Sequence, residues 1–230
     1  CVSNLRSSLF MVIAMAAFSL EDMFIKSASS LVPVGEILML FGAGGTLAFI
    51  IMTLSRGHAV FHPQILSGPV LVRAIFEVVG RLFFTLAIVF TPLSSASAIL
   101  QATPLVVVMG AALFLGERVG WRRWIAILIG FIGVLIIIRP GLESFEQSSL
   151  LAVIGMLGFA GRDLATRAAS PALSHLQLGI YGFFILIPTG IFMLIFNIGP
   201  ENQGLTNQGF IWLNITSSVQ ILAATLFGVM

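Results

Sequence analysis

The chain has 230 residues, of which 58% are hydrophobic and only 9% are charged, and its formal net charge is +2. Soluble domains usually carry about 25% charged residues, so this composition excludes a water-exposed globule and indicates an integral membrane protein. The small, scattered positive charge excludes a nucleic-acid-binding protein.

Cysteine and histidine are too sparse for a metal or redox site. The single cysteine, Cys1, excludes an internal disulfide and a thiolate cluster. The three histidines are isolated from one another along the chain, so we expect no metal, no cofactor and no catalytic residue. Because the chain opens on Cys1 and stops inside an apolar run, we interpret it as a C-terminally truncated fragment.

Eight apolar windows follow one another along the chain. A helix needs roughly 20 mostly apolar residues to cross a bilayer, and windows of this kind lie at residues 8–27, 34–54, 69–90, 94–115, 122–138, 149–167, 176–197 and 209–230. They are too long for membrane β-strands and lack their period of two. The sequence therefore predicts an all-α integral membrane protein with about eight helices in this chain.

The first window ends on a charged stretch that recurs 141 residues later. Asp22 pairs with Asp163 and Lys26 with Arg167 at this offset. Further identical pairs are Leu9 with Leu150, Met15 with Met156, Phe18 with Phe159 and Ser29 with Ser170. Apolar similarity between any two membrane helices does not readily explain an acid, a base four residues later and a serine seven residues later. We therefore predict a duplication, with a first repeat over residues 1–141 and an incomplete second repeat over 142–230.

The first repeat has five windows, which is an odd number of membrane spans. The second repeat must therefore begin on the opposite side of the membrane and lie inverted in it. Inverted repeats are typical of secondary transporters, whose sites lie near the midplane of the bilayer. Asp22 would then lie near the outer end of its helix and Asp163 near the inner end of its own, each placed to serve one gate. Either aspartate could bind a solute amine or carry a proton. The alternative is a pair of local ion pairs, Asp22 with Lys26 and Asp163 with Arg167. Arg162 precedes Asp163 and takes the place that Glu21 has in the first repeat.

The window at 69–90 carries Arg73, Glu77 and Arg81 on one stripe, four residues apart. A charge at the centre of a membrane helix costs about 2.5–3.5 kcal/mol on insertion scales. We expect Arg73 to extend to the cytoplasmic surface. Arg81, about 18 Å from the start of the window at 1.5 Å per residue, is expected to face a cavity. The alternative is a buried Glu77–Arg81 pair that locks helices together.

The window at 94–115 contains Pro104, which has no N–H and so leaves the carbonyl of Leu100 without its helical partner. Such a carbonyl must be satisfied by protein or water. We predict a kink, flanked by Gln101 and Thr103, that lines a water-filled path; a packing kink is the alternative. After this window, Glu117 is expected to anchor the cytoplasmic loop together with Arg118 and Arg122. Small residues at Ser95, Ser97, Ala126, Gly130 and Gly133 are expected to let helices approach closely.

Basic residues set the predicted orientation. With a cytoplasmic N-terminus, the cytoplasmic side holds six of them and the outer side holds two. The six are Arg6, Arg56, Arg118, Arg122, Arg123 and Arg167, and the two are Lys26 and Arg139. The positive-inside rule therefore predicts a multi-pass protein of the cell inner (plasma) membrane with its N-terminus in the cytoplasm.

The stretch from Pro92 to Gly141 resembles the closing part of an EamA-type repeat of the drug/metabolite transporter superfamily. The features that carry the resemblance are the small-residue run 94–98, Pro104, the "GER" at 116–118, the Gly130–Gly133 pair and the terminal "RPG". This resemblance implies ten helices in two five-helix repeats, cytoplasmic termini and transport of small metabolites. The counterparts of Pro104 and Glu117 in the second repeat would fall near positions 245 and 258, past Met230.

The predicted function is secondary transport of a small polar or amphipathic metabolite, such as an amino acid or a vitamin-like compound, by alternating access. The partners expected are this solute, the lipid bilayer and H+ or another coupling ion, and a homodimer is left open. The alternatives are a membrane-embedded lipid-modifying enzyme and a structural membrane subunit that transports nothing. The candidate substrate-binding or gating residues are Asp22, Glu77, Arg81, Gln101, Thr103, Arg162 and Asp163.

Overall fold

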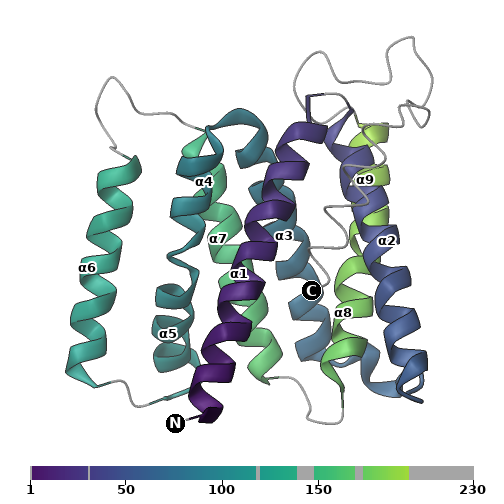
Figure 1. The fold of residues 1–230 in the computed structure, drawn as a ribbon, viewed down its shortest axis with the longest axis horizontal. Helices are drawn as coiled ribbons and strands as arrows, with labels where there is room; N and C mark the ends of the chain where they lie inside the picture. The colour runs from purple at the N-terminus through teal and green to yellow at the C-terminus, as the bar shows by residue number, and fades with distance from the viewer. Residues whose placement is uncertain (1, 31, 118–119, 139–147, 169–172, 197–230) are drawn as a thin grey trace. The chain divides into compact units, whose positions relative to one another are not determined.

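The computed structural model describes residues 2–30, 32–117, 120–138, 148–168 and 173–196, and every regular element in these ranges is helical (Figure 1). The elements are α1 (Val2–Ala28), α2 (Val34–Ser55), the 3-10 turn η1 (Pro63–Leu66), α3 (Gly68–Phe90), α4 (Leu93–Leu100), α5 (Thr103–Phe114), α6 (Trp121–Ile138), α7 (Ser149–Ala168), α8 (His175–Phe184) and α9 (Leu186–Ile195).

These helices confirm the prediction of an all-α membrane protein. Five predicted windows correspond to α1, α2, α3, α6 and α7. The windows at 94–115 and 176–197 are each divided into two helices, α4 with α5 and α8 with α9. Among the described residues, four stretches are long and apolar enough to cross a membrane by length and composition, namely Val34–Ser55, Leu93–Phe114, Ser149–Ala168 and His175–Ile195. The window at 209–230 lies outside the described residues.

The break between α4 and α5 lies where Pro104 predicted it. The hydroxyl of Thr103 donates a hydrogen bond to the carbonyl of Leu100, which is the carbonyl that Pro104 deprives of its helical partner. A protein group therefore satisfies this carbonyl locally. Figure 1 shows α4 and α5 following one another end to end. The predicted water-filled path beside the break stays a prediction.

Contacts divide the chain into two compact units. Unit 1 comprises Cys1–Val60 and Gly179–Met230, and unit 2 comprises Phe61–Leu178. Unit 1 thus contains α1, α2, α9 and most of α8, whereas unit 2 contains α3 to α7. The predicted repeats, 1–141 and 142–230, divide the chain differently, because α7 would belong to the second repeat and α3 to the first. The repeat boundaries remain a prediction.

In unit 1, α2 packs antiparallel against α8 and α9. A β-carbon placed on Gly35, at the start of α2, would lie 2.7 Å from the carbonyl oxygen of Gly190 in α9. Further along α2, Phe49 lies against Gly179 of α8. The backbones therefore approach closely without intervening side chains at the α9 end. A buried cluster that includes Ile25, Phe41 and Leu186 fills this unit.

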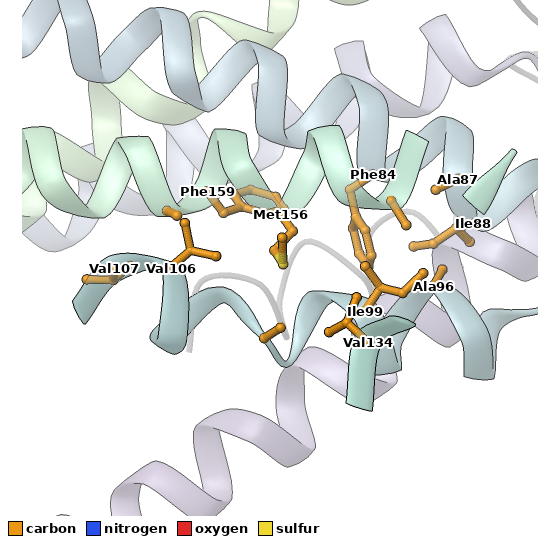
Figure 2. Close-up of a cluster of buried hydrophobic side chains, with 13 residues drawn as sticks. Phe84, Ala87, Ile88, Ala96, Ile99, Val106, Val107, Val134, Met156 and Phe159 are labelled. Carbon is orange, nitrogen blue, oxygen red and sulfur yellow. The ribbon is translucent and has the colours of Figure 1, made fainter. Parts of the chain in front are cut away.

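In unit 2, α3 packs antiparallel against α7, and a second apolar cluster lies beside this pair (Figure 2). Its buried members are Phe84, Ala87, Ile88, Ala96, Ile99, Ala102, Val106, Val107, Val134, Ala152, Met156, Phe159 and Ala160. They come from α3, α4, α5, α6 and α7 and from the break before α5, so one core holds all five helices of the unit. On α6, by contrast, Leu128, Ile129 and Ile136 are more than 60% exposed, as expected of side chains that face lipid.

One of the predicted small-residue contacts, that of Gly130, is confirmed, and that of Gly133 has no counterpart among the described residues. Gly130 of α6 lies against the side chain of Leu105 in α5, so the absence of a side chain at this position allows the contact. A β-carbon on Gly133 would meet no heavy atom within 4 Å. Within the described residues, Gly133 therefore makes no close helix contact of the predicted kind, and its role stays a prediction.

Candidate functional site

A charged network connects α3 and α7 within unit 2, and Glu77 of α3 lies at its centre. The Glu77 carboxylate forms ion pairs with Arg73, one turn earlier on α3, and with Arg162 of α7, each at 3.6 Å. The side chain of Glu77 is only 8% exposed and that of Arg73 only 12%. These charges therefore lie inside the packed helices and neutralise one another there.

Arg162 is also bound by Asp163, which lies at the exposed edge of the network. The Oδ1 atom of Asp163 accepts a hydrogen bond from Nε of Arg162, at 2.9 Å, and forms an ion pair with Nη2 of the same arginine, at 2.8 Å. The side chain of Asp163 is 41% exposed and that of Arg162 is 26% exposed. Arg162 therefore lies between a buried carboxylate, Glu77, and an accessible one, Asp163.

Thr166 ties the network to the backbone of α7. Its hydroxyl accepts a hydrogen bond from Nε of Arg73, at 3.1 Å, and donates one to the carbonyl oxygen of Arg162, at 2.8 Å. This hydroxyl thus uses both its donor and an acceptor position. It fixes the orientation of Arg73 relative to α7.

An aromatic ring borders the network on α7. The guanidinium carbons of Arg162 and Arg81 lie 5.0 and 5.6 Å from the centre of the Phe159 ring, which is cation–π distance. Phe84 contacts the same ring edge-on, with 6.0 Å between centroids. The Phe159 ring therefore joins the apolar core to two arginines.

Glycines allow these side chains to meet. A β-carbon on Gly158 of α7 would lie 2.4 Å from the backbone nitrogen of Gly80 in α3, and one on Gly155 would lie 2.9 Å from the nitrogen of Phe84. With Gly161, which lies against Phe76, these glycines recur every three residues. They form a stripe that brings the α3 and α7 backbones together.

Three predicted site residues, Glu77, Arg162 and Asp163, are in direct contact, and Arg81 joins them through Phe159. The Glu77–Arg81 pair, which was the alternative to a cavity-facing Arg81, is not the arrangement found. The four-residue spacing allowed Glu77 two partners on α3, and Glu77 pairs with Arg73 and with Arg162 of α7. Because Arg73 pairs with Glu77, its side chain is mostly buried and does not extend to the cytoplasmic surface, contrary to the prediction.

The alternative of an ion pair between Asp163 and Arg167 is not found either. Asp163 binds its neighbour Arg162, and Arg167 instead contacts Glu117 at 3.4 Å, with both side chains about half exposed. The predicted loop anchor at Glu117 therefore acts on the end of α7. Of the two residues predicted to act with it, Arg118 lies outside the described residues, and the guanidinium carbon of Arg122 lies 5.7 Å from the centre of the Trp121 ring.

The remaining predicted residues lie elsewhere in the structure. Asp22 is buried in α1 of unit 1, where its side chain and backbone are together 9% exposed. Gln101 and Thr103 lie at the α4–α5 break in unit 2, and Gln101 is exposed. Neither has a hydrogen bond to the charged network among the described residues.

Sequence reasoning missed Thr166 and Phe159 as parts of this site. A threonine four residues after an arginine carries no distinctive signal, because its partner Arg73 comes from a helix far away along the chain. Phe159 had a signal, since it recurs at the offset of 141 from Phe18. The described residues contain no group of three or more His, Cys, Asp or Glu side chains that could hold a metal ion.

Known proteins resemble this chain in sequence. The profile of the EamA-like transporter family matches residues 5–139. The pseudopaline exporter CntI of Pseudomonas aeruginosa is 30% identical over 184 residues, which are 79% of this chain and 63% of the exporter. The riboflavin transporter of Vibrio cholerae is 30% identical over 62% of this chain and 47% of that protein. The S-adenosylmethionine uptake transporter of Rickettsia bellii is 28% identical over 42% of this chain and 33% of that protein.

These relatives are named as transporters and not as enzymes, as the sequence predicted. The chain spans less than two thirds of their length. A solved crystal structure shares the fold, with a TM-score of 0.60 at 20% identity over 95% of this chain and 78% of that chain. Since the family profile covers more than half of the residues, this chain belongs to the EamA-like transporter family.

Proposed function

We propose that this chain is part of a secondary transporter that moves a small polar or amphipathic metabolite across the inner membrane by alternating access. Its membership of the EamA-like family supports this proposal, as do relatives named for pseudopaline, riboflavin and S-adenosylmethionine. The coupling ion in this proposal is H+ or another ion, and the N-terminus is cytoplasmic.

The observation that carries the proposal is the charged network of α3 and α7. Each charge at the centre of a membrane helix costs about 2.5–3.5 kcal/mol on insertion scales. Arg73, Glu77, Arg162 and Asp163 nonetheless gather between two helices of one unit. Charged residues inside membrane helices mark solute and ion pathways, so this network is the proposed solute site.

The packing of α2 supports the inverted repeat on which alternating access would depend. A β-carbon on Gly42 of α2 would lie 2.8 Å from the carbonyl oxygen of Phe183 in α8, and 183 − 42 = 141, the offset of the predicted repeat. A twofold axis in the membrane plane relates helices that run antiparallel, and residues close to the axis contact their own counterparts. The contact between Gly42 and Phe183 has this form.

The test is solute flux through the purified full-length protein in proteoliposomes. Riboflavin and S-adenosylmethionine are the first solutes to measure, each with and without an imposed pH gradient. We expect uptake of at least one small metabolite, and we expect Glu77→Gln to abolish it. Glu117→Gln is the matched control, because it removes a carboxylate from a half-exposed ion pair outside the network. Equal flux in the two variants, or no flux of any solute under any gradient, would refute the proposal.

A further inference from the structure

Arg162 has partners of two kinds, some fixed and one replaceable. The fixed partners are the buried carboxylate of Glu77, at 3.6 Å, and the ring of Phe159, at 5.0 Å. Both hold the guanidinium group in place from within the packed α3–α7 pair. Neither of these two contacts involves the third partner, Asp163.

Asp163 is the replaceable partner because it is accessible. Its side chain is 41% exposed, against 8% for Glu77. Its hydrogen bond and its ion-pair contact with Arg162 both end on one oxygen, Oδ1, so a single side-chain rotation breaks them together. A half-exposed carboxylate loses little when it returns to water.

We propose that Arg162 recognises a carboxylate group of the solute, and that Asp163 occupies Arg162 until the solute displaces it. This inference rests on the proposed function and specifies the class of solute, a small metabolite that carries a carboxylate group. The planar guanidinium group matches a carboxylate through two parallel hydrogen bonds. The charges balance before and after the exchange: Arg73 and Arg162 face two carboxylates in the empty site, and the solute carboxylate takes the place of Asp163.

The proposal predicts how accessible Arg162 is to a chemical probe. Phenylglyoxal modifies accessible arginine side chains, and the modified peptide can be measured by mass spectrometry on the purified full-length protein. We expect Asp163→Asn to raise the labelling rate of Arg162 about fivefold, because a half-exposed ion pair is worth up to about that factor. Asp163→Glu keeps the charge and should label at the original rate. Arg73, held by Glu77 and Thr166, is the internal reference.

Benzoate and its neutral ester, methyl benzoate, form the ligand test. We expect benzoate to slow the labelling of Arg162, at lower concentration in Asp163→Asn than in the unchanged protein, and methyl benzoate to have no effect. Equal protection by both compounds, or protection by inorganic phosphate alone, would overturn carboxylate recognition. Unchanged labelling in Asp163→Asn would overturn the role of Asp163.

This test does not depend on transport. If Asp163→Asn fails to fold, as judged by size-exclusion chromatography, the comparison of benzoate with methyl benzoate on the unchanged protein still decides whether Arg162 recognises a carboxylate. Solute flux in proteoliposomes without protection of Arg162 would overturn this inference and leave the proposed function standing. Protection by benzoate in a protein that transports nothing would refute only the proposed function.

Discussion

Substitution of Gly158 by alanine tests the close packing of α3 against α7. The new β-carbon would lie 2.4 Å from the backbone nitrogen of Gly80 and 2.5 Å from its Cα. Ordinary van der Waals contact begins at 3.4 Å, so the helices must separate by about 1 Å, that is 3.4 − 2.4. The obstacle is backbone, so no change of rotamer can relieve it.

The expected loss follows from this separation. Overpacking of this kind costs typically 1–3 kcal/mol, and the same movement would lengthen the 3.6 Å contact between Glu77 and Arg162 beyond ion-pair distance. On the scale of a soluble domain of this size, about 2–3 kcal/mol corresponds to a fall in melting temperature of roughly 4–12 °C. We therefore expect Gly158→Ala to melt several degrees below the unchanged protein.

The assay is thermal unfolding of the detergent-solubilised protein, followed by size-exclusion chromatography of heated samples. Gly133→Ala is the matched control, because a β-carbon on this helical glycine of α6 meets no heavy atom within 4 Å. Its stability should change by less than about 0.5 kcal/mol. If Gly158→Ala and Gly133→Ala melt at the same temperature, the α3 and α7 backbones do not meet as described.

Three further predictions address charge, the helix break and topology. Glu77→Gln should lower the free energy of unfolding by about 3–5 kcal/mol, since it leaves buried arginines without their carboxylate. Glu117→Gln should lower it by less than about 1 kcal/mol. Chemical denaturation of both variants would check this. Thr103→Val should cost about 1–3 kcal/mol because a carbonyl loses its hydrogen-bond partner, and Thr103→Ser should restore most of the loss in the same melting assay. In a cysteine-free background, Lys26→Cys and Arg167→Cys should react with membrane-impermeant maleimide from opposite sides of the membrane, and labelling from the same side would contradict the inverted repeat.

The positions of the helices could be predicted from the sequence because the bilayer sets their length. The window at 34–54 became α2 (Val34–Ser55), and the one at 122–138 became α6 (Trp121–Ile138). Pro104 also marked the break before α5 correctly, since a missing N–H is a property of one residue. The break between α8 and α9 was missed, although Pro188 lies four residues after Phe184 and gives the same signal.

The partners of the charged side chains could not be predicted, because they depend on contacts between distant parts of the chain. Spacing on one helix placed Glu77 within reach of both Arg73 and Arg81 and could not choose between them. The choice is made by α7, which brings Arg162 to the same carboxylate. The sequence does show a spacing of three residues between Gly155, Gly158 and Gly161. This spacing would have identified the face of α7 that packs against α3.

The direct apposition of Gly80 and Gly158 has a consequence for any transport cycle. Two main chains that touch without a side chain between them have no compressible layer, so neither helix can slide or tilt against the other without a steric barrier. Rearrangement must therefore carry α3 and α7 together as one rigid element. If the repeats are those predicted, this element contains one helix from each repeat, α3 and α7. The helices that move against one another in the cycle then lie elsewhere than at the α3–α7 contact.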